Sequence, residues 1–108
     1  MNVARELERR LERIVDGLSA AIFRGRMHPV DMANRLVRQA DLDLTDSPAG
    51  PQIPNHYRVR INPADFTTEL DHNQLAGELV NALSVTAEER GWRTGGPVRV
   101  EIQIDESV

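Results

Sequence analysis

A short stretch of strict alternation between polar and apolar residues constrains this chain most. From His56 to Ile61 the sequence reads His-Tyr-Arg-Val-Arg-Ile, and Pro54 and Pro63 stand on either side of it. A period of two puts one set of side chains on a core and the other set in water, and proline stops the pattern at each end. The stretch is predicted to be a half-buried β-strand whose apolar face the rest of the chain must cover.

A second alternating run, residues 98–104, predicts another strand near the C-terminus. Between the two strands, apolar residues at helical spacing predict a helix over residues 71–90. Asp71 and Gln74 form its capping box, and Gly91 ends it. Strand, helix and strand in this order favour a right-handed crossover, with the two strands parallel if they are neighbours in one sheet.

The N-terminal part of the chain is predicted to be helical. Apolar residues recur over residues 3–23 with the period of an amphipathic helix, and the same positions fit a heptad seam. We therefore expect either a monomer or a weak dimer through this helix. Gly25 ends it, and Pro29 opens a second helix that continues to Ala40. So short a connection predicts an αα-hairpin.

The stretch over residues 41–52 is predicted to be a mobile loop, with room for an extra edge strand near residues 42–46. The expected fold is α+β: three helices packed on a small mixed sheet, in the order α-α-β-α-β. With 108 residues, the chain fits one domain over residues 1–108.

Composition limits the kinds of site that the chain can carry. Cysteine is absent, which excludes disulfides and thiolate metal sites. The longest apolar runs are far shorter than the roughly 20 residues that span a bilayer, and the mean hydropathy is -0.44. No apolar run resembles a signal peptide. We expect a cytoplasmic protein without a membrane span.

Charge is distributed unevenly along the chain. Residues 1–40 hold eight Arg and five acidic residues, whereas residues 41–108 hold five Arg and twelve acidic residues. The acidic part would repel a phosphate backbone, which argues against nucleic acid as the partner and confines any such role to the basic N-terminal helices. A small α+β nucleic-acid-binding domain that uses these helices is the alternative function.

The sequence shows no catalytic, cofactor or metal site. His28, His56 and His72 do not stand at ligand spacing, and no serine lies in a G-x-S-x-G elbow. The Gly95-Gly96 pair precedes a strand, whereas a phosphate cradle opens a helix. We expect a protein that is not an enzyme and binds no cofactor.

One group of basic residues is a candidate binding site. It joins the turn after the first helix to the polar face of the central strand, which would hold an anionic ligand if both lie on the same side; its members are Arg24, Arg26, His28, Arg58 and Arg60. Separate, solvated charges are the other interpretation of these residues.

Three motifs resemble the N-terminal domain of actinobacterial FHA-domain proteins of the FhaA type. They are Gly25-Arg-Met-His-Pro-Val-Asp-Met-Ala-Asn-Arg-Leu-Val-Arg, Pro54-Asn-His-Tyr-Arg-Val-Arg-Ile with Asp65, and Ala87-Glu-Glu-Arg-Gly-Trp with Gly96-Pro-Val-Arg-Val. In that family, a polar linker joins this domain to an FHA domain that binds phosphothreonine peptides. The family is associated with Ser/Thr protein kinase signalling and with control of cell-envelope synthesis.

The resemblance implies a non-catalytic interaction or scaffold module. Its expected partners are proteins, such as a Ser/Thr kinase or regulators of envelope synthesis. These 108 residues contain no FHA domain, so phosphopeptide binding is not transferred to any of them. The resemblance also implies a kinase substrate, and Thr45, Thr67 and Thr68 lie in acidic, turn-like segments that a kinase could reach.

Overall fold

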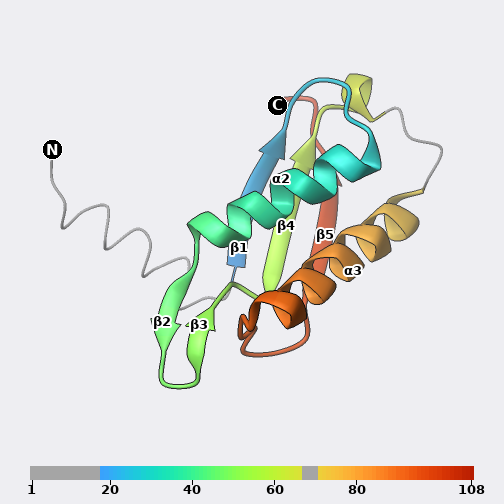
Figure 1. The fold of residues 1–108 in the computed structure, drawn as a ribbon. Helices are drawn as coiled ribbons and strands as arrows, with labels where there is room; N and C mark the ends of the chain where they lie inside the picture. Colours follow the sequence, from blue (N-terminus) through green and yellow to red (C-terminus); the bar gives the residue numbers. More distant parts are fainter. Residues whose placement is uncertain (1–17, 67–70) are drawn as a thin grey trace, which may run out of the picture.

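Three parallel strands form the main sheet of the protein, and β4 lies at its centre. In the computed structural model, which describes residues 18–66 and 71–108, these strands are β1 (Leu18–Phe23), β4 (His56–Ile61) and β5 (Arg99–Ile104). Their order in the sheet is β1-β4-β5 (Figure 1). Arg58 of β4 stands opposite Ala20 of β1 and opposite Glu101 of β5. The strand that the alternating sequence predicts is therefore confirmed, as is its parallel pairing with the C-terminal strand.

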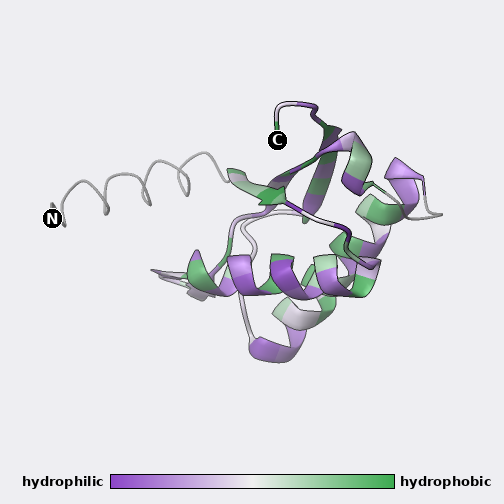
Figure 2. Cartoon of the chain, turned by 90° about the horizontal axis from the view of Figure 1, so that it is seen from above, coloured by the Kyte–Doolittle hydropathy of each residue, from purple (hydrophilic) through white to green (hydrophobic). Residues whose placement is uncertain are grey.

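Two helices cover one face of this sheet. They are α2 (Pro29–Leu42) and α3 (His72–Arg90), which lie side by side in a layer apart from the strands (Figure 2). Tyr57, Val59 and Ile61 of β4 have no exposed surface, because their side chains point into the space between the layers. The helices contribute the other large core side chains: Met32, Leu36, Leu75, Leu79 and Leu83.

The ends of both helices follow from local sequence. Pro29 occupies the first turn of α2, and the His28 ring accepts a hydrogen bond from the amide of Val30. Asp71 and Gln74 form the predicted capping box at the start of α3. Gly91 ends α3 with a φ of 69°, in the left-handed region that favours glycine. The predicted bounds of α3 are thus confirmed.

The stretch predicted to be a mobile loop is instead ordered as the end of α2 and a β-hairpin. β2 (Thr45–Ser47) and β3 (Gly50–Gln52) pair antiparallel as a separate sheet, so the expected edge strand does not join the main one. The segment around β3 is also hydrogen-bonded to the chain after α3, because the amide of Arg93 donates to Pro51 and the amide of Ile53 donates to Arg93. One turn of 3-10 helix, η1 (Pro63–Asp65), follows β4.

The α+β class is confirmed, but the expected arrangement of three helices on a mixed sheet is wrong. The described residues form two α-helices, and the three-stranded sheet is entirely parallel. Residues 18–23, predicted to end the first helix, form β1, which also removes the expected αα-hairpin. Residues 3–17 of the predicted helix, and with them the expected dimer seam, lie outside the described residues.

The apolar spacing of β1 fits either type of element, and pairing with β4 decides for the strand. Leu-Ser-Ala-Ala-Ile-Phe is a short run in which helical and strand periods are hard to separate. Ser19 lies fully buried on the helix-covered face, which a simple apolar pattern would not predict. Its hydroxyl donates to the carboxylate of Asp43 at 2.9 Å, so the buried hydroxyl has a hydrogen-bond partner.

Asp43 fastens the end of α2 to β1. It is the C-cap residue of α2, and its carboxylate accepts hydrogen bonds from Ser19 of β1 and from the side chain of Gln39. The Tyr57 hydroxyl lies buried on the same side of the sheet, without a hydrogen-bond partner among residues 18–66 and 71–108. Burial raises the pKa of Tyr57, and the charge of Asp43 raises it further.

We predict that Leu79→Ala lowers the free energy of unfolding by about 2–5 kcal/mol, because it leaves a cavity between α3 and the sheet. Val85 lies on the same helix and is 45% exposed. The matched variant Val85→Ala should change the free energy by less than about 0.5 kcal/mol. Urea denaturation of both variants measures the difference. Equal losses would contradict the placement of α3 on the sheet.

Candidate functional site

The carboxyl ends of the three parallel strands meet at one end of the sheet, which we call the carboxyl edge. Three segments lie there: residues 24–28 after β1, residues 62–65 after β4, and residues 105–108 after β5 (Figure 1). The amide of Gly25 donates to the carboxylate of Asp65 at 3.0 Å, and the side chain of Asn62 donates to the carbonyl of Val108 at 2.8 Å. Open sheets of parallel strands commonly bind ligands at this end.

Arg60 and Asp105 form an ion pair at the carboxyl edge. The guanidinium of Arg60 donates to the carboxylate of Asp105 through Nε, at 2.8 Å, and through Nη2. The hydroxyl and the amide of Ser107 donate to the other carboxylate oxygen at 2.6 and 2.9 Å. These bonds from Ser107 and Arg60 lower the pKa of Asp105 to about 2.

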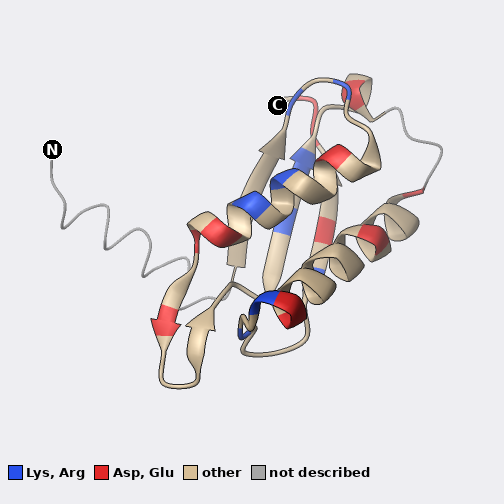
Figure 3. Cartoon of the chain, viewed as in Figure 1, with Lys and Arg blue, Asp and Glu red and all other residues tan. Residues whose placement is uncertain are grey.

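The face of the sheet opposite the helices carries alternating charges. Within the described part of the chain, no helix lies on this face (Figure 2). Arg58 donates to Glu101 at 3.3 Å, and the His56 ring lies 3.6 Å from the same carboxylate. The hydrogen bond from Arg58, together with the charges of Arg58 and His56, holds the pKa of Glu101 below its ordinary value. Basic positions on β4 therefore lie beside acidic positions on β5 and after it (Figure 3). The side chains of Arg58 and Arg60 donate hydrogen bonds to Glu101 and Asp105, respectively.

The five residues of the predicted basic patch lie in different surroundings. Arg24 and Arg26 are exposed at the carboxyl edge. Arg60 lies near the end of β4, where it is paired with Asp105. Neither Arg24 nor Arg26 makes an ion pair with any acid in residues 18–66 or 71–108. The His28 ring is engaged as the cap of α2, and Arg58 lies further down β4, beside Glu101.

Of the three predicted phosphorylation sites, only Thr45 lies among the described residues. It begins β2, is half-buried, and its hydroxyl lies 3.4 Å from the carbonyl of Gln52, to which it donates. Thr67 and Thr68 lie outside the described residues.

The histidines occupy separate environments. His28 caps α2, His56 lies beside Glu101, and the ring of His72 packs edge-on against Phe66 with 4.9 Å between the centroids. In residues 18–66 and 71–108, side chains of His, Asp and Glu nowhere gather in a group of three that could hold a metal ion. Neither described helix is long and apolar enough to cross a membrane.

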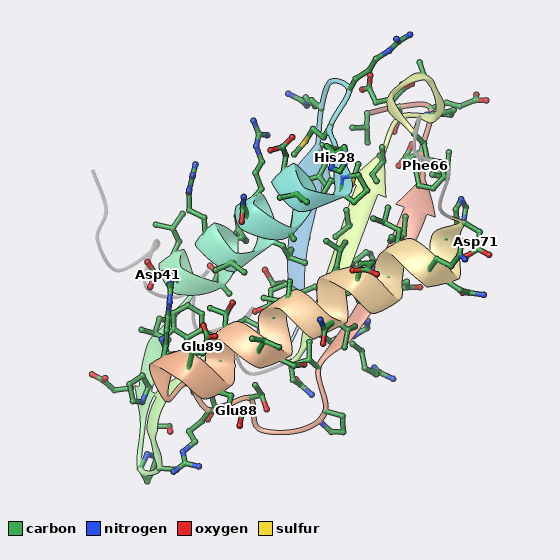
Figure 4. The ribbon with its side chains drawn as sticks, turned by 45° about the vertical axis from the view of Figure 1, so that its right-hand side comes forward. His28, Asp41, Phe66, Asp71, Glu88 and Glu89 are labelled. Carbon is green, nitrogen blue, oxygen red and sulfur yellow. The ribbon has the colours of Figure 1, made fainter. Side chains whose placement is uncertain are left out.

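A cleft that sequence reasoning missed lies between the start of α3 and β5. Its volume is about 420 Å³, and His72, Asn73 and Ala76 of α3 face Val100 and Ile102 of β5 across it. Figure 4 shows Asp71 and Phe66 at this end of α3, with Glu88 and Glu89 at the opposite end. The cleft depends on the placement of α3 along an edge strand, for which no local sequence pattern gives a signal.

We predict that Asp105 titrates with a midpoint near pH 2 in the folded protein. Because its folded pKa is depressed below the ordinary 3.8, the ion pair stabilises the protein fully above about pH 4 and loses this effect as the pH falls through 2. Carboxyl NMR titration measures the midpoint, and Arg60→Gln combined with Ser107→Ala should move it toward 3.8. A wild-type midpoint already near 3.8 would contradict the described hydrogen bonds.

Comparison with known protein families identifies a family for this chain. The family model described as FhaA, N-terminal domain, matches residues 5–108. Neither the curated proteins nor the solved structures gave a match. The matched range contains all three motifs, the carboxyl edge and the cleft beside β5. This chain belongs to the FhaA N-terminal domain family.

Proposed function

We propose that this domain is a non-catalytic protein-interaction module, which serves as a scaffold in signalling proteins. The observation that carries the proposal is the pair of exposed arginines at the carboxyl edge, Arg24 and Arg26, which have no ion-pair partner among the described residues. Such guanidinium groups can form bidentate hydrogen bonds with carboxylates. The proposed partner is an acidic segment of a Ser/Thr kinase or of a regulator of envelope synthesis.

The ion pairs on the helix-free face support this role. Arg58 donates to Glu101 through Nε, so its two terminal nitrogens stay available to a partner, and Arg60 is held against Asp105. Exposed ion pairs of this kind add little to stability. They fix the positions of alternating charges on a rigid strand, and fixed charges select the partner and its orientation more than they add affinity.

We predict that the double variant Arg24→Glu and Arg26→Glu weakens binding of a decaglutamate peptide at least tenfold. Loss of charge-assisted hydrogen bonds at two arginines accounts for an effect of about 1.4 kcal/mol or more. Arg35→Glu with Arg38→Glu is the matched control, because both residues are exposed on α2 and the change in net charge is the same. Fluorescence polarisation at 50 mM salt measures the affinity of both double variants for the peptide.

Equal losses in the two double variants would mean that net charge alone governs binding, which would remove the carboxyl edge as the contact surface. Mixed-sequence RNA serves as the competing ligand in the same assay. RNA that binds more tightly than decaglutamate, with an affinity that falls steeply as salt is added, would replace the proposal by the nucleic-acid alternative.

We also predict that the proposed partner kinase, a Ser/Thr protein kinase, phosphorylates Thr45, Thr67 or Thr68. Phosphate on Thr45 would remove the hydrogen that its hydroxyl donates to Gln52, so modification would loosen the hairpin. Mass spectrometry after incubation with the kinase locates the phosphate. Phosphate found only on Thr86, within α3, would contradict the assignment of accessible segments.

A further inference from the structure

The outer edge of β5 presents main-chain groups that have no partner among residues 18–66 and 71–108. The amide of Arg99 donates to Asn55 at 2.7 Å and the amide of Asp105 donates to Ile61 at 2.9 Å, at the two ends of the ladder with β4. In parallel strands, alternate residues direct both the N–H and the C=O toward the same neighbour. Odd-numbered residues from 99 to 105 therefore bond to β4. Val100, Ile102 and Ile104 direct their main-chain groups outward, where no described residue bonds them.

This edge lacks the bulge, the proline and the lysine that commonly block strand addition, and its charged side chains are Arg99 and Glu101. The pairing of β5 with β4 continues without a bulge over all six residues, and the strand contains neither proline nor lysine. Natural edge strands are commonly protected by such residues or by a bulge. A six-residue edge with unpaired main-chain groups is a template for another strand.

The cleft beside α3 provides room at this edge. Val100 and Ile102, which carry the outward main-chain groups, form one wall, and Ala76 with His72 and Asn73 forms the other. The small side chain of Ala76 leaves space, and the packing of His72 against Phe66 fixes the polar end of that wall. A groove between a strand edge and a helix is a recurring way to bind an extended peptide.

The charges around the cleft favour an acidic occupant. Arg99, His56 and His72 line it, and the single acid among its lining residues is Glu101. Arg58 already bonds to that acid at 3.3 Å. A carboxylate on the added strand would therefore lie near Arg99 without facing an unpaired acid.

We propose that an extended acidic segment of a partner protein binds in this cleft as a fourth strand of the sheet, beside β5. The proposal rests on the protein-binding function proposed above but uses a different surface. Residues of the segment that face α3 are small and apolar, to fit against Ala76, and residues that face the helix-free side are acidic, to meet Arg99. Main-chain hydrogen bonds to Val100 and Ile102 supply the affinity.

The test uses a blocked decapeptide of alternating Val and Glu, and a second peptide that is N-methylated at alternate residues so that it cannot form the ladder. Val100→Pro removes an outward N–H while leaving every bond to β4, which proline at an edge permits. Ala76→Arg fills the cleft from the helix and does not touch the strand. We expect the Val-Glu peptide to bind the wild type. Its affinity should be at least tenfold lower for each variant, and the methylated peptide should bind the wild type at least tenfold more weakly. Circular dichroism checks that the variants fold.

Failure of the Val-Glu peptide to bind, or equal binding of the methylated peptide, would overturn the proposal. A loss confined to the Arg24→Glu and Arg26→Glu variant would also overturn it, because the peptide would then lie at the carboxyl edge. Sedimentation equilibrium measures whether the wild type forms a dimer, and so tests whether a second copy of this chain occupies the edge. A wild-type dimer that Val100→Pro dissolves would show that the edge pairs with itself, and would contradict the peptide proposal.

Discussion

Hydrogen bonding of β4 on both of its sides holds this structure together. β1 pairs along one side of β4 and β5 along the other, each over six residues. Tyr57, Val59 and Ile61 meanwhile fill the centre of the core with no exposed surface. Because side chains alternate along a strand, the same pairing that buries these three residues directs Arg58 and Arg60 to the opposite face. The core and the charged surface are consequences of one strand.

The parallel direction of the strands determines where the candidate binding surfaces lie. All three carboxyl ends come to one end of the sheet, so residues far apart in the sequence meet there, such as Gly25 and Asp65 or Arg60 and Asp105. The acids on the charged face have lowered pKa values because arginines and a serine bond to them. Arg58 and Arg60 on the helix-free face are thus paired with acids, whereas Arg24 and Arg26 are exposed.

The sequence predicted those elements whose signals are local. The alternation around Val59, the capping box at Asp71 and the glycine at position 91 each depend on neighbouring residues, and all three are confirmed. For β1 the local sequence predicts the end of a helix, whereas the strand is determined by its pairing with β4 and by the hydrogen bond between Ser19 and Asp43, 24 positions away. Long-range pairing overrode the local period. The sequence predicts a loop where the hairpin after α2 forms, because the contacts of its second strand with Arg93 are distant in sequence.

The same distinction applies to the candidate sites. The basic residues could be grouped from the sequence because they lie on one predicted strand and one predicted turn. The sequence could not predict that acids pair with Arg58 and Arg60. Glu101 and Asp105 lie beside these arginines only because of the register between β5 and β4. The cleft beside β5 gave no signal for a similar reason: it requires α3 to lie along an edge strand.

Amide hydrogen exchange followed by NMR shows whether β4 is the inner strand of a parallel sheet whose β5 edge is open. We expect slow exchange for every amide from Tyr57 to Arg60. In β5 we expect alternation, with Glu101 and Gln103 slow and Val100 and Ile102 fast. Fast exchange at Arg58 and Arg60 would show that β1 does not pair with β4. Uniformly slow exchange along β5 in the isolated protein would show that its edge is already occupied.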